Sequence, residues 1–280
     1  MSASLSYLTS LYSDAFGGGS SLLDTIYGIG GSSGGSTNPV QALQSAEQNQ
    51  KQDVKVTAAQ PMVQAAIKGF TAAVQSAKSM TQLLADPAFM NVLLTANGMS
   101  DQIGYTALAT KALTSNLSDP NSLANQLTDT RWKTLAQTYS FFSAGLAAFQ
   151  KPATIASIAN AYATATWQTN EDSVTPGLSN ALAFKPLAST ITSVDQILGN
   201  PTMRTVITTA LGIPEQIAFQ DINAQEQAIS TRIDITKFKD PKFVETFVQQ
   251  YLIANAASST SSSSTPDLTT LAVQGQGILA

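Results

Sequence analysis

DPAFMNVLLTANGMSDQIGY, residues 86–105, occurs a second time as NPTMRTVITTALGIPEQIAF, residues 200–219. The two stretches align without a gap, because each residue of the first corresponds to the residue 114 positions later. Self-similarity at a fixed spacing indicates a duplicated supersecondary unit. Asp-Pro and Gly are also common helix punctuation, which is the alternative reading, but the gapless alignment favours duplication. The identical pairs are Gln82 and Gln196, Leu84 and Leu198, Pro87 and Pro201, Val92 and Val206, Thr95 and Thr209, Ala96 and Ala210, Gly98 and Gly212, Gln102 and Gln216, and Ile103 and Ile217.

Each copy predicts a helix, a stop and a second helix. Asp86 or Asn200 can accept hydrogen bonds from the free amides of a first helical turn, and the proline that follows occupies a position where a donor is not needed. Gly98 or Gly212 then supplies the left-handed residue that often follows a helix end. We therefore predict an all-α multihelical bundle built on a duplicated helix-Gly-helix unit, with repeats at about 79–142 and 193–255.

The composition restricts the chemistry that the chain can perform. It has 280 residues with no cysteine and no histidine, so thiolate chemistry, disulfides and histidine-based catalysis are excluded. Charged residues make up 11% of the chain, against about 25% in an ordinary globular domain. The surface is therefore expected to be polar but nearly uncharged, which favours self-association.

Charge and hydropathy also bear on partners and location. The net charge is −4 without a basic cluster, which argues against nucleic-acid binding. No apolar run reaches the roughly 18 residues of a transmembrane segment. No Lys or Arg precedes Lys51, so we expect no cleaved secretory signal, because such signals begin with a basic region.

The chain divides into a body and two tails. Residues 1–37 form an apolar N-terminal tail and a Gly/Ser linker, residues 38–255 the helical body, and residues 256–280 a Ser/Thr linker and an apolar C-terminal tail. Strand signals are weak, because no two alternating runs are joined by a hairpin turn. Within the body, Gly and Pro punctuation predicts helices at about 40–57, 61–77, 131–142, 152–168 and 241–255, and one that ends near Phe184 before Lys185-Pro186.

Several motifs have structural interpretations that outweigh functional ones. The glycines of residues 28–33 lack the strand, helix and third glycine of a dinucleotide loop, so we interpret them as linker. The adjacent carboxylates Glu171 and Asp172 are interpreted as belonging to a helix end, and a glycosidase pair is the alternative. Trp132 and Trp167 are expected in the core, with a ligand platform as the alternative.

Asp129 and Arg131 flank a predicted helix start. Asp129 could cap that helix, and Arg131 could pair with a carboxylate elsewhere in the chain. No constellation in the sequence supports a catalytic nucleophile, a metal site or a cofactor, so we predict that the chain is not an enzyme.

The body resembles a known family. LSDP at 117–120, LANQL at 123–127, DTRW at 129–132 and LGIP at 211–214 are together similar to domain of unknown function 1217, over about residues 56–253. This resemblance implies a multihelical domain and a flagellar association, because the family is encoded largely in alphaproteobacterial flagellar gene clusters. It brings no catalytic residues. Two positions depart from the family pattern, since Lys185 stands where an Arg is common and Thr130 where a Pro is common.

The apolar tails suggest how such a protein could assemble. Flagellar axial subunits are similar in plan, with terminal segments that become coiled when subunits stack. The alternative is that both tails are simply disordered ends. The candidate assembly residues are Leu5, Leu8, Leu11 and Tyr12 in the N-terminal tail, and Leu268, Leu271, Val273, Ile278 and Leu279 in the C-terminal tail.

These observations lead to one principal hypothesis and two alternatives. The principal hypothesis is a structural or assembly component of the bacterial flagellum that is exported by the flagellar type III apparatus and binds other flagellar proteins and itself outside the cell. The first alternative is a cytoplasmic adaptor or assembly factor that binds a partner helix in a groove between the two repeats. The second is a secreted hydrolase that uses Asp and Glu alone.

Overall fold

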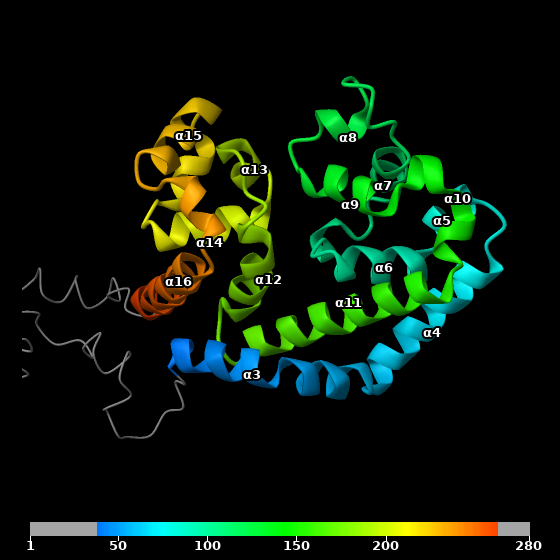
Figure 1. Cartoon of the computed structure of the whole chain (residues 1–280), viewed down its shortest axis with the longest axis horizontal. Helices are drawn as coiled ribbons and strands as arrows, with labels where there is room; N and C mark the ends of the chain where they lie inside the picture. The colour runs from blue at the N-terminus through cyan, green and yellow to red at the C-terminus, as the bar shows by residue number, and fades with distance from the viewer. Residues whose placement is uncertain (1–37, 263–280) are drawn as a thin grey trace, which may run out of the picture.

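The computed structural model describes residues 38–262, which contain fourteen α-helices, α3 to α16, three short 3₁₀ helices and no strand. The predicted all-α multihelical fold is confirmed. The helices form two lobes with separate hydrophobic cores, joined by the long helices α3 and α11 (Figure 1). No helix of this part of the chain is long and apolar enough to cross a membrane.

The first lobe contains the first sequence copy. Its core includes Phe70, Leu93, Trp132 and Phe149, which are almost completely buried. Its elements are α4 (Pro61–Ser76), α5 (Met80–Ala85), α6 (Pro87–Ala96), η1 (Ser100–Gln102), α7 (Thr106–Leu113), α8 (Leu123–Gln126), α9 (Arg131–Tyr139) and α10 (Phe141–Phe149).

The second lobe contains the second copy. Its core includes Phe184, Ile207, Phe238 and Tyr251, and it takes in Leu43 from the first turns of α3. Its elements are the N-terminal part of α3 (Pro39–Ala58), α12 (Leu178–Ala188), α13 (Val194–Leu198), α14 (Pro201–Ala210), η2 (Glu215–Phe219), α15 (Ile222–Ser230), η3 (Ile235–Lys239) and α16 (Pro241–Ser262).

Helix α11 (Pro152–Asp172) belongs to both lobes. Ile158 in its first half lies in the first core, and Trp167 in its second half lies in the second core. Figure 1 shows α11 running beside α3 along the base of both lobes. The prediction that Trp132 and Trp167 lie in the core is confirmed, since the two residues are 1% and 2% exposed.

The two sequence copies have the same local structure. The side chains of Asp86 and Asn200 cap α6 and α14 as predicted, each accepting from an amide of the first turn. Gly98 and Gly212 follow the helix ends with φ of 68° and 60°, the left-handed conformation predicted for them. The amide of the next residue bonds back into each helix at 2.8 Å, to the carbonyls of residues 94 and 208. The two stretches therefore share their caps, their glycine conformation and the hydrogen bond that follows it.

The predicted helix at 131–142 is wrong at its C-terminal end. Helix α9 ends at Tyr139, and Ser140 adopts a left-handed conformation with φ of 50°, so that α10 begins at Phe141 in a new direction. The turn brings Phe141 against Phe149, with ring centroids 4.6 Å apart, and Phe149 also contacts Phe89. Burial of these rings stabilises a turn for which the serine gives no sequence signal.

Helix α12 does not end before Lys185-Pro186 as predicted, but continues to Ala188. A proline in a helix removes one backbone donor and disfavours the helical conformation at the residue before it. Here packing and ion pairs stabilise the helical turn around Pro186, because Phe184 and Ala188 are fully buried and Lys185 is bound by two carboxylates. Helix α16 likewise extends past the expected boundary at residue 255, to Ser262.

Candidate functional site

The predicted assembly residues Leu5, Leu8, Leu11, Tyr12, Leu268, Leu271, Val273, Ile278 and Leu279 lie outside the residues that the structure describes, as do the glycines of residues 28–33. The structure shows where the tails join the body. The N-terminal tail leads into α3, and α16 leads into the C-terminal tail. The first turns of α3 and the first half of α16, as far as Leu252, pack in the core of the second lobe, so both tails connect to helices of the same lobe (Figure 1).

An ion-pair cluster ties these two helices together. Lys185 of α12 binds the carboxylates of Glu47 on α3 and Glu245 on α16. Burial alone would lower the pKa of Lys185, but the two carboxylates hold it above its ordinary value. Burial likewise works to raise the pKa of Glu245, and the bonds from Lys185 and Gln249 hold it below its ordinary value. The cluster therefore ties α3 and the start of α16 to α12.

Sequence reasoning singled out Lys185 only as a departure from the family pattern. Its partners, Glu47 and Glu245, lie 138 and 60 residues away. Nothing in the local sequence around any of the three residues indicates this contact, since the pairing depends on how α3, α12 and α16 pack.

Two grooves lie side by side where α14 ends against the C-terminal half of α16. The first has a volume of about 460 Å³ and is lined by small, apolar and amide side chains, including Ala210, Ile253 and Ala254, with no charged residue. The second, of about 420 Å³, is polar and contains Glu215. Both share Thr209 and Gly212, so they form one continuous surface on the lobe to which the tails connect.

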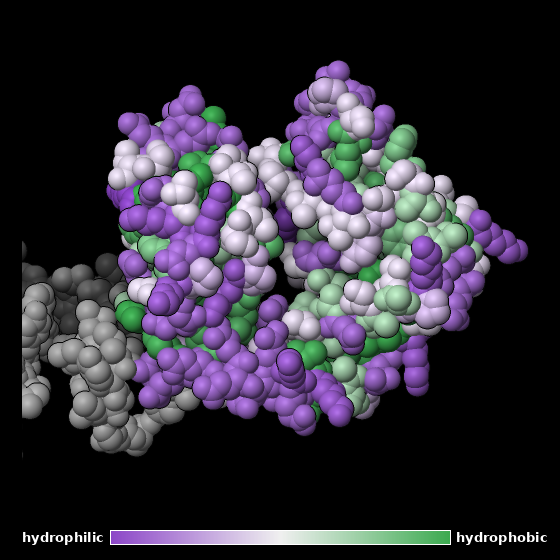
Figure 2. Space-filling model, viewed as in Figure 1, coloured by the Kyte–Doolittle hydropathy of each residue, from purple (hydrophilic) through white to green (hydrophobic). Residues whose placement is uncertain are grey.

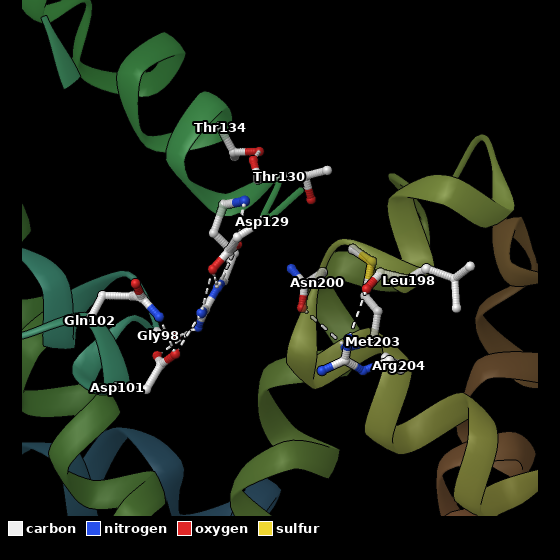
Figure 3. A network of polar contacts seen from close by, with 11 residues as sticks. Gly98, Asp101, Gln102, Asp129, Thr130, Thr134, Leu198, Asn200, Met203 and Arg204 are labelled. Atoms are coloured by element: carbon white, nitrogen blue, oxygen red, sulfur yellow. Dashed lines mark hydrogen bonds and ion pairs between the residues drawn. The ribbon is translucent and has the colours of Figure 1, made fainter. Parts of the chain in front are cut away.

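A buried arginine organises the first lobe. Arg131 is 8% exposed and donates from Nη1 to the Gly98 carbonyl at 2.7 Å and to Asp101 Oδ1 at 2.9 Å, and from Nη2 to Asp101 Oδ2 at 2.8 Å. Its other side binds Asp129, which also accepts from the Arg131 amide (Figure 3). The prediction that Arg131 pairs with a distant carboxylate is confirmed. Asp129 stabilises the start of α9 as well, because it accepts that first-turn amide.

The other acidic motif is also structural. Asp172 Oδ1 accepts from the amides of Gly177 and Ser179 at 2.9 and 3.0 Å, and from the Ser179 hydroxyl at 2.9 Å. The carboxylate therefore ends α11 and starts α12, as the helix-end interpretation predicted for the pair with Glu171.

The lobes also touch beside the arginine cluster. The Thr130 amide donates to the Gly199 carbonyl at 2.9 Å. A Cβ atom at Gly199 would lie 2.6 Å from the Thr128 carbonyl oxygen and 2.6 Å from Thr130 Cγ2. The backbone of Gly199 is in an ordinary conformation, with φ of −79°, so the position requires glycine for space and not for flexibility. Thr130, where the family often has proline, uses its amide in this contact.

We expect Gly199→Ala to reduce the free energy of unfolding by about 1–3 kcal/mol, because the methyl group must separate the lobes at this contact. The matched control is Gly69→Ala in α4, where the added Cβ would only touch Ala88 Cβ at 3.4 Å. There the better helix propensity of alanine should leave stability unchanged or raise it by up to about 1 kcal/mol. Urea denaturation measures both, and equal effects of the two substitutions would show that the Gly199 contact is not tight.

Beyond this contact the lobes diverge. Figure 2 shows a hollow between them. Figure 3 shows the Arg131 cluster facing Asn200 and Arg204 of the second lobe across this space, with Arg204 Nη1 donating to the Leu198 carbonyl at 3.3 Å. The hollow lies between the two sequence copies, where the adaptor hypothesis expected a groove.

Each copy also exposes an aromatic ring at its end. Tyr105 and Phe219, which occupy equivalent places in the two copies, are 60% and 91% exposed. They follow η1 and close η2, respectively. Single exposed apolar residues are common on protein surfaces, so they mark no site by themselves.

Comparison with known proteins places this geometry in a family. The model of the family described as "Protein of unknown function (DUF1217)" matches residues 96–244, more than half of the chain. The chain is also similar to the crystal structure of protein AGR_C_984 from Agrobacterium tumefaciens, with 26% identity and a TM-score of 0.67 over 80% of this chain and 96% of that one. No curated protein matches the chain.

Proposed function

The chain belongs to the DUF1217 family, proteins of unknown function, and from that premise we propose that it is a non-enzymatic structural component of the bacterial flagellum. In this proposal the subunit is exported by the flagellar type III apparatus and assembles with other flagellar proteins and with itself outside the cell. The observation that carries the proposal is that both apolar tails join the same lobe, at helices tied together by Lys185.

The connection of both tails to the same lobe affects the free energy of assembly. A segment of about 15 residues with an apolar stripe buries too little surface by itself to offset an ordering cost of roughly 1–2 kcal/mol per residue. Tails that connect to the same lobe can share one set of contacts in a stack of subunits. Each large apolar side chain buried there would contribute about 1.5–3 kcal/mol.

The surface composition supports the same proposal. The chain has few charges and a net charge of −4, so copies repel one another little. The apolar groove beside α16 carries no charged side chain and lies on the lobe to which the tails connect. Absence of histidine and cysteine suits a structural role more than a catalytic one.

The location can be tested directly by quantitative mass spectrometry of sheared flagella and of the cytosol from the same cells. We expect the chain in the external fraction, in amounts that follow the other axial proteins. Recovery from the cytosol alone would rule out export and favour the cytoplasmic adaptor, whose supporting observation is the hollow between the lobes (Figure 2).

Deletion of residues 266–280 is expected to abolish incorporation into the flagellum while leaving the thermal midpoint of the body nearly unchanged. The deleted stretch carries the apolar residues of the C-terminal tail, whereas the described cores lie wholly within residues 38–262. Calorimetry measures the midpoint, and immunoblotting of sheared flagella measures incorporation. Normal incorporation of the deletion variant would show that this tail is dispensable for assembly.

A further inference from the structure

In the first sequence copy, Gly98, Asp101 and Asp129 together bind the guanidinium of Arg131. The left-handed Gly98 presents its carbonyl, and Asp101 in η1 presents both carboxylate oxygens, to the fork of Arg131 at 2.7–2.9 Å. A guanidinium suits this arrangement because its planar N–H groups can bind a carboxylate through two parallel bonds and still reach a carbonyl.

The second copy has Gly212 and Glu215 at the positions equivalent to Gly98 and Asp101, and no basic residue is paired with Glu215 in the described part of the chain. Gly212 and Glu215 stand 114 positions after Gly98 and Asp101, with the same left-handed glycine, the same backbone bond behind it and a 3₁₀ helix that starts at Glu215. They line the open polar groove of about 420 Å³. Within residues 38–262, Glu215 forms no ion pair.

The arginines of this chain form hydrogen bonds with groups other than Glu215. Past the aligned stretch the next shared motif, Asp119-Pro120 and Asp240-Pro241, is 121 positions apart, and the residue 121 positions after Arg131 is Leu252, whose side chain has no donor. Arg204 donates to the Leu198 carbonyl and Arg232 to the Ala228 carbonyl. The tails carry no Lys or Arg, since the first basic residue is Lys51 and the last is Lys242.

We propose that the groove at Gly212 and Glu215 binds the guanidinium of an arginine from a partner protein, in the manner in which Gly98 and Asp101 bind Arg131. The adjoining groove is uncharged and shares Thr209 and Gly212, so the partner segment carries apolar or small residues beside its arginine. This inference is independent of the flagellar assignment, because it rests on the comparison of the two copies.

The test uses the full chain and a small probe, Nα-acetyl-L-arginine amide, followed by amide chemical shifts at low ionic strength. The matched probe is the citrulline analogue, which keeps the shape of arginine but has no charge. We expect saturable shifts at Gly212 and Glu215 with the arginine probe, and an affinity at least about fivefold weaker with the citrulline probe. Glu215→Gln should weaken arginine binding by a similar factor, whereas Glu171→Gln, which removes the same charge outside the groove, should not.

Several results would overturn the proposal. Among them are no shift up to about 100 mM probe, equal binding of the arginine and citrulline probes, and unchanged binding of the arginine probe by Glu215→Gln. Shifts at Gly212 that appear on raising the protein concentration without probe would assign the groove to a second copy of this chain. Because Glu215 is exposed, Glu215→Gln should fold normally, and its thermal midpoint should equal that of the unmodified protein.

Discussion

Truncation of Leu93 or Ile207 to alanine is expected to reduce the free energy of unfolding by roughly 2–5 kcal/mol in each case. The two residues occupy equivalent positions on α6 and α14, and each is 0% exposed. Leu93 lies in the first core and Ile207 in the second. Each substitution removes buried methyl and methylene groups and leaves a cavity that surrounding helices fill only partly.

The control is a second pair at the same spacing. Asn91 and Thr205 are exposed on the same two helices, so their substitution by alanine should change stability by less than about 0.5 kcal/mol. Urea denaturation of the four variants compares the faces directly. Small effects at both Leu93 and Ile207 would contradict the assignment of the buried face in the two copies.

Replacement of Arg131 by methionine is expected to cost about 2–4 kcal/mol, because it leaves Asp101, Asp129 and the Gly98 carbonyl without their donor. The figure lies below that for a fully buried pair, since the side chain of Asp101 is 53% exposed and that of Asp129 23%. Lysine at this position should restore only part of the loss, as it lacks the planar fork.

Arg232→Met provides the comparison, because the exposed side chain of Arg232 donates, among the described residues, to the Ala228 carbonyl alone. Its effect should remain within about 0.5 kcal/mol. A loss of similar size in Arg131→Met would mean that the buried cluster adds little to stability.

The same variant should change the response to acid. Hydrogen bonding from Arg131 is the largest of the effects that hold the pKa of Asp101 below its ordinary value of 3.8. A carboxyl group whose pKa is lowered in the folded state contributes stability above that ordinary value, and the contribution is lost as the pH falls through the folded-state pKa. Stability should therefore drop less between pH 6 and pH 3 in Arg131→Met than in the unmodified protein, while the contribution of Glu245 is common to both.

The features that could be predicted from the sequence are those set by local chemistry. Caps at Asp86 and Asn200, left-handed glycines at 98 and 212, and buried tryptophans all follow from residue type and spacing. The pairing of Arg131 with a distant carboxylate was also predictable, since a guanidinium forms strong charge-assisted hydrogen bonds with a carboxylate. Which carboxylate it binds, 30 residues away, was not.

The remaining features depend on packing between distant segments. Ser140 turns left-handed because two phenylalanine rings are buried around it, and α12 continues through Pro186 because both neighbouring helices hold it. The placement of the two copies in separate lobes depends on α11 and α3, which run along the base of both lobes. The grooves at Gly212 likewise arise only where α14 and α16 meet.

Because both tails connect to the second lobe, that lobe alone transmits tension between them. A pull on residues 38 and 262 passes from the first turns of α3 to α16 through Leu43, Leu252 and the Lys185 cluster. In an optical-trap experiment with handles at these positions, the first rupture should separate α3 from α16. Until that rupture the first lobe, with α4 to α10, lies outside the load path and carries no tension.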